Sequence, residues 1–309
     1  MAARNPTVFC IVLNVNGREL VREALDSLGR MTYPAFKLIV VDNGSTDGSQ
    51  AAVREGYPDV MLIENGANLG FGEGNNVGMK YALDAGAEWI LLLNNDIVVP
   101  PDMLSEMMKV AESDPAIGML APKIYYHSRP EIFWYAGGEV NFWTGIVSHR
   151  GVGRRDSGQY DRVEDTGYIT GCAMLIRREV LERVGLFDPV YSPGYSEDAD
   201  LSQRALRAGF RLVYVPQAKL WHKVSAFSGG GMSAMKTRLK VEHNMIFMKR
   251  YARWYHWLTI PWCVGGLAIL FVIGQLLKGN FATVGALAKG FLKALGRLFS
   301  SGGTNKLSS

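Results

Sequence analysis

Residues 89–93 form a continuous apolar run, Trp-Ile-Leu-Leu-Leu, that leads directly into Asn94, Asn95 and Asp96. A short apolar run that ends in turn residues is typical of a strand buried on both faces of a parallel sheet. In open α/β sheets, ligands bind outside the carboxyl ends of the strands, where the N-termini of adjacent helices attract anions. We therefore expect Asp96 to lie at the edge of a crevice that binds a phosphorylated substrate.

The first hundred residues repeat this strand pattern and alternate it with helical patterns. Ser45 or Thr46 can cap one of the helices, and Pro101 suits the first turn of another. The alternation predicts an α/β fold with a parallel sheet. The expected strands are 8–13, 38–41, 60–63 and 89–93, and the expected helices are 20–28, 46–55, 74–86 and 102–112.

Residues 123–171 are rich in glycine and aromatic residues and predict β-hairpins with a mobile loop. The chain then returns to the earlier alternation. We expect a strand at 171–176, helices at 178–184 and 201–208, and a strand at 212–215.

Charge is distributed unevenly along the 309 residues. Residues 236–309 contain eleven lysines and arginines and a single acid, Glu242, whereas the first 235 residues carry a net charge of −6. A basic C-terminal region predicts contact with an anionic partner. Its charges flank a long apolar run rather than base-stacking aromatics, which favours anionic lipid and argues against nucleic acid.

The cysteines and the N-terminus indicate a cytoplasmic protein. Cys10, Cys172 and Cys263 are too few and too scattered for a disulfide framework or a zinc site, so a reducing compartment fits best. The apolar run at 8–15 is short, is interrupted by Asn14 and lacks a signal-peptide cleavage site. We expect the catalytic part to stay in the cytoplasm.

Residues 258–277 contain no charge and are long enough to cross a hydrocarbon core of about 30 Å as a helix. Basic residues flank both ends of this run, although they prefer the cytoplasmic side of a membrane. A re-entrant or shallow placement would satisfy both flanks, with Pro261 and Gly265-Gly266 supplying a bend. A single crossing and a buried pair of helices in a soluble core are the alternatives.

After Asn280 the sequence becomes amphipathic. Lys289, Lys293 and Arg297 recur every four residues and so share one face of a helix. We expect this helix to lie in the membrane interface.

Five segments together resemble glycosyltransferase family 2, and most closely its bacterial rhamnosyltransferase-like members. They are 14–17 (Asn-Val-Asn-Gly), 40–47 (Val-Val-Asp-Asn-Gly-Ser-Thr-Asp), 68–76 (Asn-Leu-Gly-Phe-Gly-Glu-Gly-Asn-Asn), 94–96 and 194–200 (Gly-Tyr-Ser-Glu-Asp-Ala-Asp). The resemblance covers roughly residues 7–250. It implies the GT-A fold, a Rossmann-like nucleotide-binding mixed sheet flanked by helices, with a C-terminal membrane-associated helical segment.

The resemblance also implies a domain division. Residues 1–250 would form the transferase domain, with a nucleotide-sugar-binding half at 1–122 and an acceptor-binding half at 123–250. Residues 251–309 would form membrane-associated helices and a tail.

By this resemblance Asp96 is a metal ligand, at the place of the Asp-any-Asp motif of GT-A enzymes. Asn94 replaces the first carboxylate, which makes the site less anionic. His222 is the expected second ligand, and an imidazole suits Mn²⁺ better than Mg²⁺. The alternatives are a turn role for Asp96 and a neutral, hydrogen-bonded His222 beside Trp221.

The adjacent acids Glu197 and Asp198 are the candidates for the catalytic base. In an inverting transfer a carboxylate takes the proton of the acceptor hydroxyl. The resemblance favours Asp198 as the base, with Glu197 orienting the acceptor. The alternative is that these acids cap a helix, and we assign Asp200 to that role.

The remaining site residues also follow from the resemblance. Asp42 is expected to accept the imide N–H of a uracil or thymine ring, with an Asx-type turn as the alternative role. The glycine-rich run at 68–76 does not fit the dinucleotide-binding pattern. The expected donor-binding residues are Leu13, Asn14, Val15, Asp42, Gly70, Asn75, Asn76, Asn94 and Asn95, and the expected acceptor-binding residues are Gly171, Tyr195 and Trp143.

These observations predict an inverting hexosyltransferase that moves a sugar, in our expectation rhamnose, from a dTDP- or UDP-sugar to a lipid-linked cell-surface glycan. It would work with Mn²⁺ or Mg²⁺ at the cytoplasmic face of the cell membrane, attached through its C-terminal region. A homodimer is an open alternative to a monomer. A polyprenyl-phosphate sugar synthase and a non-catalytic membrane scaffold are the rival functions.

Overall fold

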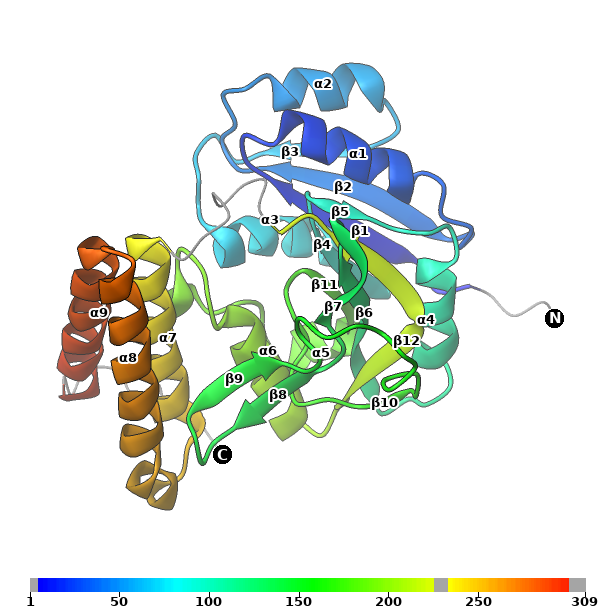
Figure 1. Ribbon diagram of the computed structural model, residues 1–309. Coiled ribbons are helices and arrows are strands. Elements are labelled where there is room, and N and C mark those ends of the chain that lie inside the picture. The colour runs from blue at the N-terminus through cyan, green and yellow to red at the C-terminus, as the bar shows by residue number, and fades with distance from the viewer. Residues whose placement is uncertain (1–4, 225–232, 300–309) are drawn as a thin grey trace. The chain divides into compact units, whose positions relative to one another are not determined.

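The computed structural model describes residues 5–224 and 233–299 (Figure 1). The chain forms two compact units. The described residues of the first unit are 5–140 and 147–224, and those of the second are 141–146 and 233–299.

The described part of the first unit is built on a ten-stranded mixed sheet in the order β10-β12-β6-β11-β4-β1-β2-β3, with β5 paired to β12 and β7 to β6. A separate two-stranded sheet joins β8 and β9. The strands are β1 Val8–Asn14, β2 Phe36–Asp42, β3 Met61–Glu64, β4 Trp89–Asn94, β5 Ile97–Val98, β6 Ile117–Tyr126, β7 Arg129–Tyr135, β8 Gly138–Asn141, β9 Ile146–His149, β10 Glu164–Asp165, β11 Ala173–Arg177 and β12 Arg211–His222.

Helices flank this sheet and connect its parallel strands (Figure 1). Helix α3 packs so closely on the sheet that a Cβ at Gly78 would lie 2.8 Å from the side chains of Ile11 and Val41. The helices of this unit are α1 Arg18–Leu28, α2 Ser49–Gly56, α3 Phe71–Asp84, α4 Met103–Ala111, α5 Arg178–Val184 and α6 Glu197–Arg207, with a 3₁₀ turn η1 at Pro189–Tyr191.

The four expected N-terminal strands are present and parallel, and their register aligns their polar ends. β1 pairs with β2 so that Asn14 faces Asp42, and with β4 so that Leu13 faces Asn94. The carboxyl ends of β1, β2 and β4 therefore meet at one edge of the sheet, which is where ligands bind in open α/β sheets.

The other half of the sheet brings the end of β12, which is distant in sequence, to the same edge. β11 is antiparallel to β4, and β12 is parallel to β6. Strand β5 pairs with the end of β12 so that Ile97 faces His222. Strand β12 continues through Pro216 to His222, well beyond the strand 212–215 that the sequence predicts, and β6 begins before the predicted hairpin region.

Three predicted helix starts were wrong. α2 begins at Ser49, because Asp47 accepts hydrogen bonds from the Ser49 backbone and hydroxyl and extends the preceding turn. α3 begins at Phe71, which places Asn75 and Asn76 inside the helix. α6 begins at Glu197, so both candidate base residues belong to its first turn.

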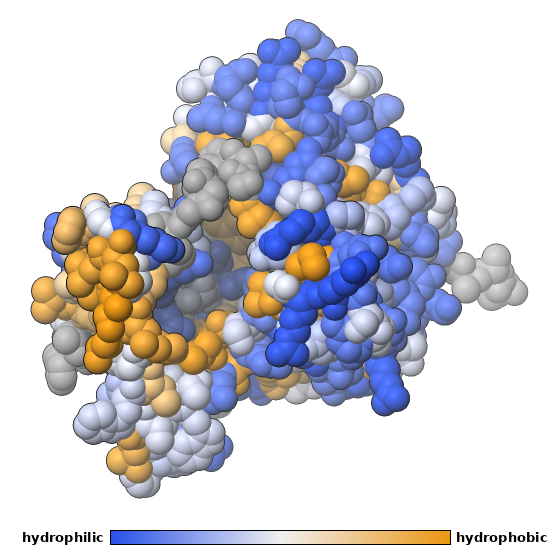
Figure 2. Space-filling model, viewed as in Figure 1, coloured by the Kyte–Doolittle hydropathy of each residue, from blue (hydrophilic) through white to orange (hydrophobic). Residues whose placement is uncertain are grey.

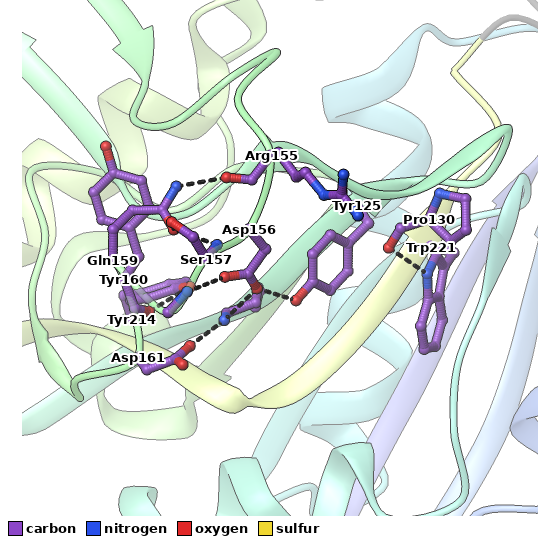
Figure 3. A network of polar contacts seen from close by, with 12 residues as sticks. Tyr125, Pro130, Arg155, Asp156, Ser157, Gln159, Tyr160, Asp161, Tyr214 and Trp221 are labelled. Atoms are coloured by element: carbon purple, nitrogen blue, oxygen red, sulfur yellow. Dashed lines mark hydrogen bonds and ion pairs between the residues drawn. The ribbon is translucent and has the colours of Figure 1, made fainter.

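The hairpins predicted after residue 123 are present as β6–β7 and β8–β9. The following loop is tied to the sheet by a network of polar contacts that includes Tyr125, Asp156 and Asp161 (Figure 3). Sequence reasoning missed the buried cation of this network, Lys123. Its Nζ lies 2.9 Å from Oδ2 of Asp156 and also contacts Asp161, and Tyr125 donates to Asp156. The loop is therefore held in place by charge pairs.

The second unit is helical in its described part. It contains α7 Ala234–Tyr251, a 3₁₀ segment η2 at Trp254–Leu258, α8 Ile260–Leu277 and α9 Phe281–Phe299. The unit includes α7, which precedes the predicted boundary at residue 250, and that boundary stays a prediction.

Helix α8 is, among the described residues, the one helix long and apolar enough to cross a membrane by length and composition. It is unbroken: Pro261 lies in its first turn, where no backbone N–H is needed, and Gly265 and Gly266 continue the helix. The chain is therefore helical through the residues at which the sequence predicted a bend.

Candidate active site

Asp96 and His222 converge at the carboxyl edge of the sheet. Asp96 lies in the turn between β4 and β5, and the pairing of β5 with β12 brings His222 beside it. Oδ1 of Asp96 lies 3.0 Å from Nε2 of His222, and both side chains are buried. Despite this distance, Oδ1 of Asp96 and Nδ1 of His222 have no hydrogen-bond partner. A buried carboxylate oxygen without a partner is costly, and here it points at an imidazole nitrogen.

This donor set fits a divalent cation. A carboxylate oxygen and an imidazole nitrogen are ligands that Mn²⁺ accepts, and Asn94 Nδ2 lies 3.5 Å from the same imidazole nitrogen. No group of three or more His, Cys, Asp or Glu side chains with metal-binding geometry occurs among the described residues. The protein would thus supply two side-chain ligands, and phosphate oxygens and water would complete the shell.

The ring of His222 is held by Trp134 of β7. The two rings meet edge to face, with centroids 4.5 Å apart and an angle of 86°. Trp221, which the alternative interpretation set beside His222, instead stacks on Tyr125. The sequence showed Trp134 only as one of many aromatics in the glycine-rich stretch, and nothing there marked it as the residue that orients His222.

Glu197 and Asp198 begin α6 after a strained turn. Tyr195 and Ser196 both have left-handed backbone conformations, with φ of 79° and 72°. Such conformations are unfavourable for residues with side chains and tend to occur at functional sites. They bring the two carboxylates to the N-terminus of a helix, where its dipole favours negative charge.

The two carboxylates differ in their surroundings. Glu197 is buried and its Oε2 has no hydrogen-bond partner, whereas Asp198 is half-buried. Asp198 accepts hydrogen bonds from the backbone N–H groups of Gly171 at 3.0 Å and Ala199 at 2.8 Å. Burial raises the pKa of Glu197 well above its ordinary value, and the charge of Asp198 adds to this rise. Burial also raises the pKa of Asp198, but the two backbone N–H groups oppose that rise.

The segment Gly171-Cys172 connects the end of β4 to Asp198. Asn94 donates its backbone N–H to the carbonyl of Cys172, and Gly171 donates its own to Asp198. A Cβ at Gly171 would lie 2.8 Å from Cζ of Phe71, so only glycine allows this close approach. Gly171, predicted to contact the acceptor, thus supports Asp198 directly.

Asp200, to which we assigned a capping role, is a fully buried residue of the first turn of α6. Its carboxylate accepts from the hydroxyl of Tyr191 at 3.1 Å and from Nε of Arg204 at 2.8 Å. Arg204 in turn donates to the carbonyls of Val184 and Leu186. Asp200 therefore anchors the segment before the strained turn to α6.

Asn14, Asp42 and Asn95 form a buried polar network at the strand ends. Asn95 donates to Oδ1 of Asn14 at 2.7 Å, and Asn14 donates to Oδ2 of Asp42 at 3.3 Å. Oδ1 of Asp42 accepts from the backbone of Ser45 and from Gln50, so the Asx-type turn is present. The contact of Asp42 with a nucleobase stays a prediction, and Oδ2 is the oxygen with capacity for it.

Asn43 organises the glycine-rich loop, and sequence reasoning did not single it out. Its amide donates to Asn68 and to the carbonyl of Gly70, and its oxygen accepts from the backbone of Leu69. Gly70 has φ of 84°, and a Cβ there would lie 2.8 Å from the backbone of Pro193. The loop is thus locked against the segment that leads to Glu197.

The two asparagines that follow this loop have different roles. Asn76 exchanges two hydrogen bonds with the backbone of Phe187, which occupies both ends of its amide. Asn75 donates to the carbonyl of Phe71, and its Oδ1 is buried without a partner. Asn75 is therefore better suited to contact a donor than Asn76, whose donor contact would require breaking those bonds.

The remaining predicted residues lie in both units. Leu13, Val15 and Tyr195 are half-buried in the first unit. Trp143 belongs to the second unit, where its ring packs against those of Tyr255 and His256. Its role in acceptor binding stays a prediction.

Known proteins resemble this chain in sequence and in fold. The sequence model described as Glycosyl transferase family 2 matches residues 8–185. The N-acetylglucosaminyl-diphospho-decaprenol L-rhamnosyltransferase of Mycobacterium tuberculosis is 30% identical over 261 residues, which cover 78% of this chain and 84% of that protein. Rhamnosyltransferase WbbL of Escherichia coli K12 is 29% identical over 220 residues, 68% of this chain and 80% of that protein.

A solved structure shares the fold. The mannosyltransferase PcManGT from Pyrobaculum calidifontis, in complex with GDP-Man and Mn²⁺, superposes with a TM-score of 0.61 at 20% identity. The match covers 94% of this chain and 88% of that one. The mixed sheet with its flanking helices is thus the GT-A fold that the sequence predicted, and the chain belongs to glycosyl transferase family 2 as a rhamnosyltransferase-like glycosyltransferase.

Proposed function

We propose that this enzyme transfers a sugar, with inversion, from a nucleotide diphosphate donor to a lipid-linked glycan at the cytoplasmic face of the cell membrane. The observation that carries the proposal is that Oδ1 of Asp96, which has no hydrogen-bond partner, lies 3.0 Å from Nε2 of His222. Hydrogen bonds of Gly171 and Cys172 link Asp198 to the end of β4, which leads to Asp96. A cation-binding pair and a carboxylate base are what this reaction requires.

The donor would lie across the carboxyl ends of β1, β2 and β4. Asp42 would accept the imide N–H of its base, with Leu13, Asn14 and Val15 alongside. Asn75, Asn94 and Asn95 would contact the ribose and phosphates. Asp96 and His222 would hold Mn²⁺ or Mg²⁺, which supplies neutralisation of the charge on the leaving diphosphate.

Asp198 would act as the base. Inversion requires the acceptor hydroxyl to attack the anomeric carbon from the face opposite the diphosphate, and Asp198 would take the hydroxyl proton as the new bond forms. Asp198 is half-buried and thus open to an acceptor, whereas the buried Glu197 with its raised pKa suits a protonated, orienting role. Tyr195 and Trp143 would contribute to acceptor binding.

Relatives suggest the substrates. The names of the two rhamnosyltransferases point to rhamnose as the sugar, and the mycobacterial name points to a diphospho-polyprenol acceptor that carries one sugar. A dTDP- or UDP-sugar suits the imide contact of Asp42. A membrane-bound acceptor also accounts for the apolar helix α8 and the basic C-terminal region.

Release of nucleotide diphosphate tests this proposal. Purified protein would be given UDP-, dTDP- and GDP-sugars with a lipid-linked glycan, in the presence of Mn²⁺, Mg²⁺ or a chelator. We expect turnover of one donor that needs both the metal and the glycan-bearing lipid. Turnover with bare polyprenyl phosphate instead would indicate a polyprenyl-phosphate sugar synthase, and a folded protein that binds no donor would indicate a scaffold.

A further inference from the structure

One face of α8 is apolar and exposed in the second unit. Only Ile260 of this helix is buried. Residues at helical spacing form the exposed face, and Figure 2 shows apolar side chains gathered over this part of the chain. The exposed fractions are 80% for Trp262, 63% for Ile269, 67% for Leu270, 49% for Ile273 and 84% for Leu277. The opposite face, with Val264, Ala268, Phe271, Val272 and Gln275, is half-buried.

Helices α7 and α9 pack side by side in the same direction. A Cβ at Gly290 would lie 2.9 Å from the carbonyl oxygen of Arg238, and one turn further along Nζ of Lys293 lies 3.1 Å from Oε1 of Glu242. Glu242 is fully buried. Helices α7 and α9 are thus closely packed and joined by an ion pair.

Helix α8 connects the end of α7 to the start of α9 and runs antiparallel to both. It starts where α7 and η2 end, and a three-residue turn at 278–280 leads into α9, which packs against it (Figure 1). At its start, Thr259 donates to the carbonyl of Trp143, and the loop 141–146 packs on Ile260 and Val264. Helix α8 is therefore tied to α9, and through α9 to α7.

This arrangement decides how α8 can meet a membrane. Its 18 residues would span about 27 Å, enough to cross the hydrocarbon core. If it crossed upright, α7 and α9 would lie at the same depth beside it. Helix α7 carries Lys236, Arg238, Lys240, Lys249 and Arg250, and charged side chains are strongly disfavoured at that depth.

The charge of the unit identifies the surface that it meets. Residues 233–299 contain ten lysines and arginines and one acid, Glu242. Basic residues occur before α8, at Arg253, after it, at Lys278, and on α9, at Lys289. Anionic headgroups on one side of a bilayer would match basic groups at both ends of the helix.

We propose that α8 lies in the plane of the membrane, with its exposed face in the acyl region of an anionic leaflet and both of its ends on the side of the catalytic unit. This inference rests on the proposed membrane attachment. It favours a shallow placement of α8 in one leaflet over a single crossing of the bilayer. It makes the enzyme monotopic.

Labelling of a cysteine at the far end of α8 tests the topology. In a Cys263→Ala background, since Cys10 and Cys172 are buried, Lys278→Cys is compared with Asp59→Cys on the exposed surface of the catalytic unit. A membrane-impermeant maleimide is applied to intact cells and to inverted membrane vesicles. We expect both cysteines to be labelled only in inverted vesicles. Labelling of Lys278→Cys in intact cells, with Asp59→Cys protected, would overturn the proposal.

Vesicle binding tests the exposed face. Leu270→Gln with Leu277→Gln should lower binding to phosphatidylglycerol vesicles at least tenfold, whereas the control Met61→Gln with Val152→Gln, on exposed positions of the first unit, should bind normally. Equal binding of both variants would overturn the assignment of this face. Sugar transfer to a detergent-dispersed acceptor is measured in parallel, so that loss of anchoring is distinguished from failure of the proposed reaction.

Discussion

The backbone N–H of Gly171 donates to Oδ2 of Asp198 at 3.0 Å, and it does so from the segment that also pairs with the end of β4. The carboxylate proposed as the base is thereby fixed relative to β4, the strand that leads to Asp96. Since a general base must be held within reach of the proton that it abstracts, this hydrogen bond determines where the acceptor hydroxyl must lie.

Replacing Asp198 with Asn should abolish most of the transfer. An amide cannot take the proton of the acceptor hydroxyl, so we expect kcat to fall by about 10²- to 10⁴-fold. The affinity for the donor, measured by calorimetry, should not change, because the donor contacts lie on other strands. Asp59→Asn, an exposed aspartate in the same unit, is the matched control. Normal turnover of Asp198→Asn would show that another group is the base.

Loss of either proposed metal ligand should weaken metal binding. We expect His222→Gln and Asp96→Asn to raise the Mn²⁺ concentration needed for half-maximal activity by at least tenfold, because each removes one of two protein ligands. Asp102→Asn, an exposed aspartate shortly after Asp96, should leave the metal dependence unchanged. Binding of Mn²⁺ can be followed by its paramagnetic resonance, independently of turnover. Unchanged Mn²⁺ affinity in both variants would contradict the assignment.

Glu197 should make the fold less stable as the pH rises. Burial raises its pKa above the ordinary 4.5, so the folded protein holds a proton that the unfolded chain releases. Stability that is present below pH 4.5 should therefore be lost as the pH rises through the folded-state pKa. Glu197→Gln has no such proton to lose, and its Tm should fall less between pH 5 and pH 8. The pKa of Asp198 is also raised, and this residue is still present in the variant. The dependence of Tm on pH should therefore become weaker in Glu197→Gln but should not disappear. Equal slopes in both proteins would refute this account.

The Lys123 network should contribute to stability through its buried members. Lys123→Met should lower the free energy of unfolding by about 1.5–3 kcal/mol, the range for a hydrogen bond to a charged group. Asp161→Asn should cost less than about 1 kcal/mol, because the side chain of Asp161 is 58% exposed. Denaturant unfolding of the two variants side by side measures both values. A larger effect of Asp161→Asn would contradict the ranking.

The sequence predicted the strand ends well, because apolar runs followed by polar residues directly encode them. Trp89–Asn94 and the aligned pair Asn14 and Asp42 are where the pattern indicated. The family motifs then identified Asp96 and His222 as a pair, although pairing between strands so distant in sequence is not encoded locally. The register of β5 with β12, which brings them together, is a tertiary property.

The wrong helix starts at α2 and α3 reflect contacts that the hydrophobic pattern does not encode. Asp47 accepts from the backbone of Ser49 at the start of α2, and the backbone N–H of Phe71 donates to the carbonyl of Pro193 at the start of α3. Asp200 looked like a helix cap by position, yet Tyr191 and Arg204 bind it in the core. Trp134 and Lys123 were missed because their roles depend on residues from other strands and loops.

The most direct test of the central claim is the transfer of a labelled sugar from a nucleotide diphosphate donor into an extractable lipid-linked glycan. We predict that the wild-type chain forms this product with Mn²⁺ or Mg²⁺, that chelator stops it, and that Asp198→Asn forms almost none. A folded wild-type protein that labels no lipid-linked glycan from any UDP-, dTDP- or GDP-sugar would contradict the account.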